Sequence, residues 1–583
     1  MKSKANLSRR HFMGIAGGIA GAAALASFAF DAPAIENKPK IDASDFTEEK
    51  RVLDVLVIGG GMAGLFAAVK AHDAGAKVLM VSKGRIGSSG LTPFAKGIFS
   101  YDKNNASMSI DQFVEKVSES AIQTNNPVFT RQLAEHSYAR VEELKTWGFF
   151  DSPLYNESFM RPISERNIGV EERVMITHLL KQDGRIIGAS GFSLDDNKII
   201  HYHAKSVILC TGSGGFKPSG FPVCDLTHDG TIMAYKAGAK VTGKEWNDGH
   251  PGSATNSGSS YDNWHGQVEE KPSTTSITIN HHLGMDLNYQ GYIYGAPVTM
   301  GPPMRQAESE PQTRQGGPFT PEAFRMTSPP PPPQKGLLRT LISGKGHSGP
   351  PGMGGEQVGG SSAGMAIHKA EGLVPINEQG LSTLPGLYAA GDALGSYMSG
   401  GIYTQIGSSL AGSAVQGAIA GEAAAKDSLN LKLSIEVTQQ YSDTITEEIL
   451  APLKRQRGYS PAWVTQVLQS VMIPNFVLYI KKERMMQAAL AYVEELREHH
   501  VPMLLASDLH SLRLAHETEN MIITAEMKLK ASIMRTESRC SHYRLDCPDI
   551  DYKNWQAWIN IHQDETGKMQ LEKQSFDKWP EFS

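Results

Sequence analysis

Three closely spaced glycines are the residues in this chain whose spacing most directly suggests chemistry. Gly59, Gly61 and Gly64 follow an apolar run at 54–58 and precede a helix-like stretch at 65–74. The first glycine permits a tight turn, the second lets the backbone approach a pyrophosphate, and the third lets the helix pack closely on the strand. The spacing therefore predicts a binding site for the diphosphate of a nucleotide.

The elements that must position these glycines are predicted to be a strand, a helix and a second strand. Residues 54–58 have the continuous apolar character of a buried parallel strand, and a second such run covers 77–82. A diphosphate would rest on the backbone N–H groups at the start of the helix, around Met62 and Ala63, where the helix dipole favours an anion.

The end of the second strand departs from the pattern of NAD-binding proteins. It reads Val81-Ser82-Lys83-Gly84, where an acidic residue would be expected to bind the ribose. The segment that begins here, VSKGRIGSSGLTPFAKGIF, resembles flavoproteins of the succinate dehydrogenase/fumarate reductase family, which includes L-aspartate oxidase and adenylylsulfate reductase. The resemblance implies FAD as the cofactor, held here by Ser82, Lys83, Ser89 and Gly90.

The resemblance continues in three later segments. Residues 204–212 are similar to the strand and loop that return to the flavin, and 227–230 to a TGDG motif whose Asp contacts FAD. Residues 384–392 are similar to the strand that ends beside the ribityl chain. The cofactor-binding residues that these segments and the following helix start imply are Gly212, Asp229, Asp392, Ser409 and Leu410.

The sequence RTESRCSHYRLDCP, within 521–548, resembles the C-terminal signature of the same family. Cys540 and Cys547 stand where a glycine and an aromatic residue are usual. We expect the cluster to tie a helical domain to the flavin domain; a catalytic role is the alternative.

Three departures from the family bear on the chemistry. The stretch 87–90 has no His for covalent attachment, so FAD should be noncovalent. The position of the family's carboxylate-binding Arg falls on Thr404 or Gln405, and 362–365 contains no His for the other carboxylate. A neutral side chain is a poor substitute for a bidentate Arg, so the substrate is not expected to be succinate or fumarate itself.

Two residues are candidates for a catalytic role, and each has a structural alternative. His250 lies in a stretch that resembles a turn whose His touches substrate; a loop histidine at a domain hinge is the alternative. The family's capping domain donates an Arg acid, and Arg305 is chosen from the Pro- and Gly-rich stretch 301–360. A solvated arginine is the alternative there.

The N-terminus resembles a twin-arginine export signal. Ser8-Arg9-Arg10-His11-Phe12-Met13 precedes a mildly apolar run, and Ala32-Pro33-Ala34 offers a cleavage site. An uncleaved anchor is the alternative. The signal predicts that the twin-arginine machinery exports the chain, folded around its cofactor, to the periplasm or another extracytoplasmic compartment.

Composition limits the class of protein. The 583 residues are 40% hydrophobic and 20% charged, as in globular proteins, with a net charge of −5. That charge argues against nucleic acid as a partner. The four Cys have no CxxC spacing, and no second dinucleotide motif follows the first. We therefore expect no bound metal and a separate redox partner protein instead of NAD(P)H.

The predicted fold is α/β. A Rossmann-like FAD-binding domain at 51–245 and 361–428 is interrupted by a capping region at 246–360, and a helical C-terminal domain with a tail covers 429–583. The predicted function is an exported FAD-dependent oxidoreductase that transfers a hydride between flavin and a small polar substrate, such as an unsaturated carboxylate. An oxidase that uses O₂ and an electron-transfer subunit without small-molecule catalysis are the alternatives.

Overall fold

The structure is a computed structural model that describes residues 35–581 with internal gaps. The gaps are 95–97, 105, 107, 151–154, 217–225, 248–370, 402–406, 433, 436, 473–475 and 479. Within this part of the chain, no helix combines the length and apolarity that a membrane crossing requires. The predicted export signal at 1–34 and nearly all of the predicted capping region lie outside the described residues.

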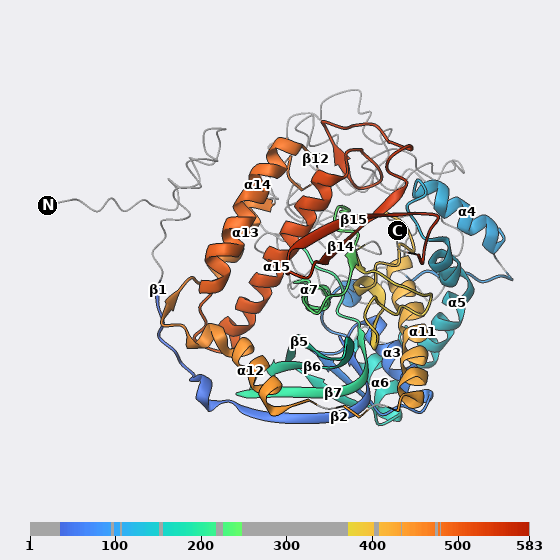
Figure 1. Ribbon diagram of the computed structural model, residues 1–583. Helices are drawn as coiled ribbons and strands as arrows, with labels where there is room; N and C mark the ends of the chain where they lie inside the picture. Colours follow the sequence, from blue (N-terminus) through green and yellow to red (C-terminus); the bar gives the residue numbers. More distant parts are fainter. Residues whose placement is uncertain are drawn as a thin grey trace, which may run out of the picture.

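A seven-stranded sheet forms the centre of the N-terminal half (Figure 1). Strand β2 (Thr47–Ile58) pairs in parallel with β3 (Val78–Ser82) on one side and with β7 (Lys198–Leu209) on the other. Helix α3 (Met62–Asp73) connects β2 to β3. The predicted strand–helix–strand unit is therefore confirmed, although β2 begins seven residues before the predicted apolar run.

The remaining strands extend this sheet at both edges. Strand β4 (Gly169–Glu172) pairs with β3, and β5 (Val174–Gln182) and β6 (Arg185–Ser193) form an antiparallel hairpin beside β7. Strand β10 (Leu387–Ala389) returns from more than 170 residues later in the sequence and pairs in parallel with β7 at Val207–Leu209. The sheet thus joins the two segments predicted to form one FAD-binding domain.

Helices cover this sheet and carry the chain between its strands. Helix α11 (Ser408–Asn430) packs closely on α3, because Gly417 and Gly421 face the backbone of Ala63 and Ala67 with no room for a side chain. The other helices of this half are α4 (Ile110–Ser120), α5 (Pro127–Thr146), α6 (Tyr155–Glu165) and α7 (Asp229–Lys236).

The C-terminal half is helical, as predicted, and has its own apolar core. Helix α15 (Leu509–Met534) runs through it against α14 (Glu483–Glu495) and α13 (Pro461–Met472), with α12 (Gln439–Lys454) nearby (Figure 1). Asp508 caps the first turn of α15 by accepting a hydrogen bond from the backbone of Ser511.

The tail has strands for which the sequence analysis made no prediction. Strands β14 (Ala557–Gln563) and β15 (Met569–Ser575) form a hairpin, and β14 pairs with β8 (Val241–Thr242). Strand β8 also pairs with β9 (Gly372–Leu373), so the two sides of the gap at 248–370 start from one small sheet. Short two-residue strands complete the description: β1 (Ile35–Glu36), β11 (Arg457–Gly458), β12 (Ile480–Lys481) and β13 (Tyr543–Arg544).

Candidate functional site

The glycine turn after β2 has a shape that only glycine permits. Gly59 has φ +121°, and a Cβ there would lie 2.1 Å from the carbonyl oxygen of Cys210. A Cβ on Gly64 would lie 1.9 Å from the carbonyl oxygen of Gly59. Gly61 precedes α3 and supplies no side-chain cap. The first turn of α3 therefore begins beside a glycine turn, as in diphosphate-binding sites, and the backbone N–H of Met62 donates to Thr92 Oγ1 at 3.1 Å.

Lys83, just after β3, is fully engaged by protein groups. Its ammonium donates to Thr227 Oγ1 at 2.8 Å, to Asp229 Oδ2 at 2.6 Å and to Glu517 Oε1 at 2.8 Å. An ammonium has three N–H donors, so all of them are used in this arrangement. Lys83 accordingly ties the flavin-type domain to α15, and the sequence analysis did not anticipate its partner there.

Asp229 begins α7 and accepts hydrogen bonds from both halves of the molecule. Besides Lys83, Thr227 Oγ1 donates at 3.0 Å and Asn520 Nδ2 of α15 donates at 2.8 Å. Burial would raise the pKa of Asp229, but the Lys83 ammonium outweighs that effect and holds the pKa below its usual value. The carboxylate is therefore ionised, and it contacts Lys83, which is also predicted to bind the cofactor.

His228 precedes Asp229 and has an unusual backbone conformation, with φ +61°. Its ring lies against Gly214, where a Cβ would approach the ring carbons to 2.0 Å. Its Nδ1 lies 2.9 Å from Glu371 Oε1, and Lys244 forms an ion pair with the same carboxylate. Burial lowers the pKa of His228, although Glu371 opposes this shift. A strained, buried histidine occupies the position where the TGDG motif has a glycine.

Two buried lysines hold the chain just before the gap at 248–370. Lys528 of α15 donates to the carbonyl oxygens of Lys244 at 2.8 Å and Trp246 at 2.9 Å. Lys481 donates to the carbonyl oxygen of Glu245 at 2.5 Å, so three successive carbonyl groups are bound by ammonium groups. The adjoining Asn247 is held by Lys528 and by the backbone of Leu478.

Lys481 also contacts His542, and the hydrogen bonds define the histidine tautomer. His542 Nε2 lies 3.2 Å from the carbonyl oxygen of Arg535, which can only accept, so Nε2 carries the proton. Nδ1 then accepts from the Lys481 ammonium at 2.8 Å. Burial and neighbouring cations lower the pKa of both side chains. These shifts favour the neutral forms of both side chains.

The C-terminal signature is a buried network of ion pairs. Arg535 donates to Glu245 at 2.8 Å and to Glu537 at 3.0 Å, and Arg539 donates to Glu537 at 2.8 Å. The Arg535 guanidinium also lies 4.7 Å from the ring centroid of Trp246. This arrangement connects the helical domain to the chain that enters the gap, which agrees with the expected structural role.

Two family models match the chain. The FAD binding domain model matches residues 54–158, and the model named Fumarate reductase flavoprotein C-term matches residues 465–580. A fumarate reductase (CoM/CoB) subunit of Methanothermobacter marburgensis is 26% identical over 85% of this chain and 94% of the relative. The fumarate reductase flavoprotein subunit of Mycobacterium tuberculosis is 25% identical over 76% of this chain and 78% of the relative. The chain is an FAD-dependent oxidoreductase.

Solved structures of flavoprotein subunits share the fold of this flavoenzyme. Adenylylsulfate reductase of Archaeoglobus fulgidus superposes with a TM-score of 0.70 at 19% identity, covering 94% of this chain and 99% of that one. E. coli quinol fumarate reductase superposes with a TM-score of 0.67 at 16% identity, covering 90% and 97%. The predicted fold class, FAD cofactor and enzyme class are confirmed.

The described residues of the flavoenzyme fit an FAD molecule. The glycine turn packs so closely on Cys210 and on its own backbone that side chains at Gly59 and Gly64 would clash, and it lies at the start of α3. Close by, the hydroxyls of Thr211 and Ser213 are buried and have no hydrogen-bond partner among the described residues. Buried polar groups usually have partners, so these orphan hydroxyls are suited to a ligand. Gly59 to Gly64, Thr211 and Ser213 would therefore hold the cofactor.

The structure brings several predicted cofactor residues to this turn. Gly391, beside Asp392, has its Cα next to the side chain of Ala63, where a Cβ would lie at 3.0 Å. Ser409 and Leu410 lie in the first turn of α11, which packs on α3. Ser82 ends β3 and faces Gly60, and Gly212 follows β7. Ser89 and Gly90 lie in the segment that follows β3, where the Ser89 hydroxyl donates to the carbonyl oxygen of Arg85.

Other predicted residues lie outside the described part of the chain. These are both catalytic candidates, His250 and Arg305, and the departures at Thr404 and Gln405. They stay predictions. Conversely, sequence reasoning missed Glu517 and Asn520, which reach Lys83 and Asp229. Their three-residue spacing on one helix face was a usable signal, because residues at i and i+3 point the same way.

Proposed function

We propose that this flavoenzyme reduces an activated C=C bond in a small anionic molecule, an unsaturated carboxylate other than fumarate. FAD supplies the hydride chemistry when bound. The chain would bind and orient both partners and exclude water from them.

The observation that carries this proposal is the pair of buried ammonium groups on Lys481 and Lys528. Their side chains are 0% and 5% exposed, and their hydrogen bonds go to carbonyl, amide and imidazole groups. Neither ammonium has a carboxylate partner within the described ranges. A protonated amine in a low-dielectric interior with no carboxylate in ion-pair contact favours an anion nearby, and Glu371 and Glu245 act on Lys528 only from beyond that contact distance.

The relatives support reduction as the reaction. Two of the similar proteins are named fumarate reductases, and the C-terminal match carries the same name. The absence of Arg at both Thr404 and Gln405 favours a carboxylate other than fumarate, because the bidentate contact that the family resemblance implies would be missing.

A separate redox partner is part of the proposal. The names of the similar proteins describe them as subunits, and this chain has one dinucleotide motif and no CxxC spacing. We expect electrons to reach the flavin from another protein.

Export is also proposed, from residues Ser8 to Met13 and Ala32 to Ala34. The test is cell fractionation of the full chain and of a variant with Arg9→Lys and Arg10→Lys. The wild-type chain should appear in the extracytoplasmic fraction, and the variant should accumulate inside. Equal distribution of both would contradict export by the twin-arginine route.

The reaction is tested on the FAD-loaded chain without oxygen. The flavin is reduced with dithionite, and its reoxidation is followed with acrylate, crotonate, fumarate and then air. Rapid reoxidation by acrylate or crotonate supports the proposal, and rapid reoxidation by fumarate alone would contradict it. Rapid reoxidation by air alone would establish the oxidase alternative, and slow reoxidation by all of them would favour the electron-transfer alternative.

A matched pair of variants tests the role of the buried charge. Lys528→Met removes the buried ammonium, and Lys530→Met removes a partly exposed one from the same helix. We expect Lys528→Met to raise KM for the anionic substrate at least tenfold while FAD content stays the same. Lys530→Met should leave KM unchanged.

A further inference from the structure

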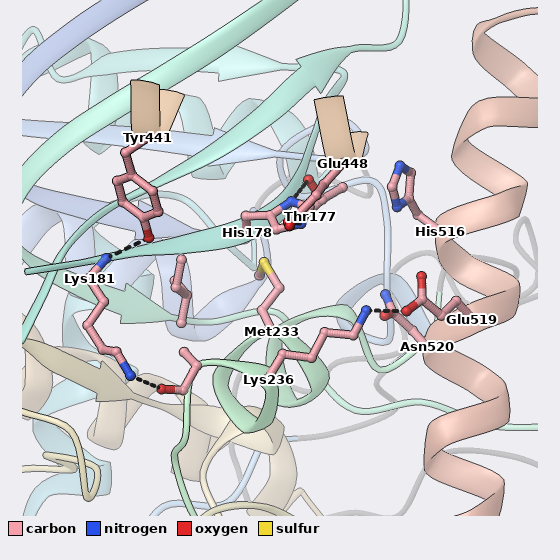
Figure 2. Close-up of a pocket in the computed structure, with 12 residues that line it drawn as sticks. Thr177, His178, Lys181, Met233, Lys236, Tyr441, Glu448, His516, Glu519 and Asn520 are labelled. Carbon is pink, nitrogen blue, oxygen red and sulfur yellow. Dashed lines mark hydrogen bonds and ion pairs between the residues drawn. The ribbon is translucent and has the colours of Figure 1, made fainter. Parts of the chain in front are cut away.

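The two ends of α7 lie in different polar surroundings. Met233 and Lys236 line a cavity of about 420 Å³ together with residues of α15, and there Lys236 is paired with Glu519 at 2.5 Å (Figure 2). His228, directly before the helix, does not line this cavity. It is 2% exposed, and its Nε2 has no hydrogen-bond partner among the described residues. Buried polar atoms nearly always have a partner, so this nitrogen is suited to a ligand.

The residues around His228 pack directly on the loop that follows β7. A Cβ on Gly214 would lie 2.2 Å from His228 Nε2, and a Cβ on Gly230 would lie 1.9 Å from Thr211 Oγ1. Gly214 also forms an antiparallel bridge with the residue that precedes His228. The unpartnered Nε2 and the unpartnered hydroxyls of Thr211 and Ser213 therefore come from two segments in direct contact.

The neighbours of His228 define which ring nitrogen carries the proton. Burial alone would raise the pKa of Glu371, but Lys244 outweighs that effect and lowers it, so the carboxylate is ionised. Nδ1 of His228 lies 2.9 Å from this carboxylate, which can only accept, so Nδ1 carries the proton. Burial lowers the pKa of His228, an effect that Lys244 and Lys528 reinforce and Glu371 opposes. In the neutral ring, Nε2 has a lone pair and can only accept a hydrogen bond.

The backbone of His228 also indicates a role for the side chain. Its φ of +61° lies in the left-handed region, which is strained for a residue with a Cβ. The TGDG motif that this segment resembles has glycine at the same place, and glycine adopts this φ without strain. The contacts of the histidine side chain must therefore outweigh the strain of its backbone.

From these observations we infer that His228 is a cofactor-binding residue, whose Nε2 accepts a hydrogen bond from a hydroxyl or N–H group of bound FAD. FAD has such donors on its ribityl chain, its flavin ring and its adenosine. The loop that His228 contacts also holds the Thr211 and Ser213 hydroxyls that fit the same cofactor. The inference concerns FAD binding and does not depend on the proposed reaction.

The test measures the Kd of FAD by dilution of the FAD-loaded full chain at pH 7, with released FAD detected by its fluorescence. Three variants separate the two ring nitrogens. His228→Asn can replace Nδ1 with its amide but has no atom at the place of Nε2, and His228→Phe keeps the ring shape without either nitrogen. His228→Gln brings an amide oxygen to the place of Nε2. We expect the Asn and Phe variants to raise Kd by at least about tenfold, and the Gln variant to stay within about threefold of the wild-type chain.

The matched control is Lys236→Met, on the same helix but in the wall of the cavity in Figure 2. It should leave the Kd of FAD unchanged. Circular dichroism verifies the folding of each variant. Because His228→Asn and His228→Phe remove the same acceptor with different side-chain shapes, one of them in the folded state is sufficient for the test.

Two results would overturn the inference. The first is a folded His228→Asn or His228→Phe chain that binds FAD as tightly as the wild-type chain, which would mean that Nε2 has another partner. The second is a His228→Gln chain weakened as much as the other two, which would mean that FAD does not depend on an acceptor at this place. None of these measurements uses turnover, so failure of the proposed reductase reaction would leave the inference unaffected.

Discussion

Lys83 and Glu517 are separated by 434 residues in the chain, and the Lys83 ammonium donates a hydrogen bond of 2.8 Å to the Glu517 carboxylate. Because Lys83 also donates to Asp229, one cation joins the strand after the glycine turn, the start of α7 and the middle of α15. The C-terminal helical domain is thereby connected directly to the elements that we expect to hold FAD.

This contact predicts a stability effect for Glu517→Gln. The Glu517 side chain is 4% exposed, so its charge-assisted hydrogen bond should stabilise the folded chain by about 1.5–3 kcal/mol. Glu519→Gln, two residues on, breaks a more exposed pair with Lys236 and should cost about 0–1 kcal/mol. Chemical denaturation of both FAD-loaded variants measures the difference. Equal losses would show that Glu517 does not connect the domains.

The glycine turn predicts a loss of cofactor in Gly64→Ala. The new Cβ would lie 1.9 Å from the carbonyl oxygen of Gly59, so α3 must move away from β2 and the diphosphate site must change. We expect FAD affinity to fall at least tenfold. Gly75→Asn, at the end of the same helix, meets only Leu429 at 3.9 Å and should retain FAD. Flavin absorbance after gel filtration provides the measurement, and full retention by Gly64→Ala would contradict the assigned role.

At Cys540 we expect glycine to stabilise the folded chain more than alanine does, the reverse of the usual order in a helix. It has φ +50° at a position where the resembling family has glycine, and its side chain is fully buried. Both Cys540→Ala and Cys540→Gly lose the thiol contact with Ala121, but only glycine adopts this φ without strain. We expect Cys540→Gly to exceed Cys540→Ala in unfolding free energy by about 1 kcal/mol.

The control for this ranking is Ala489 in α14, which has ordinary helical surroundings. There, Ala489→Gly should lower the unfolding free energy by about 1 kcal/mol. If Cys540→Ala were the more stable of its pair, the positive φ would carry no strain.

Local sequence patterns were sufficient to predict the first strand, helix and strand of the flavin-type domain. The glycine spacing and the apolar runs each depend on neighbours within a few residues, and β2, α3 and β3 followed them closely. Strand β10 also lies in the segment 384–392, where the resemblance to the family implied a strand.

Long-range contacts were beyond the sequence analysis. The hydrogen bonds of Lys83 and Lys528 depend on how two domains pack. The spacing of Glu517 and Asn520 indicates that they share a helix face, but it does not indicate what that face contacts. His228 was passed over because the motif has glycine there, and a positive φ cannot be read from a histidine in the sequence. The hairpin of β14 and β15 depends on pairing with β8, more than 300 residues earlier.

The state of the flavin attachment is open to a direct test. The segment 87–90 contains no His, so we predict that acid precipitation releases all the FAD into the supernatant. Absorbance of the supernatant and in-gel fluorescence of the pellet measure the two fractions. Fluorescence that stays with the denatured chain would establish a covalent bond through another residue.

The buried ammonium of Lys528 predicts a specific dependence of stability on pH. Burial lowers its pKa to about 8, an effect that Glu371 and Glu245 oppose and Lys244 reinforces. Below pH 8 the amine holds its proton in the folded and the unfolded chain alike. Between pH 8 and about 10.4, only the unfolded chain holds it, so deprotonation progressively relieves the cost of burying the charge.

The contribution of Lys528 to stability should therefore rise with pH across this interval. We expect the unfolding free energy of the wild-type chain, relative to Lys528→Met, to increase by about 3 kcal/mol between pH 8 and 10.5 and to be constant from pH 6 to 7.5. Lys530→Met controls for the loss of a lysine from the same helix. Parallel curves for the wild-type chain and Lys528→Met would mean that Lys528 titrates alike in the folded and unfolded chains. Its ammonium would then not be the buried charge on which the proposed anion site depends.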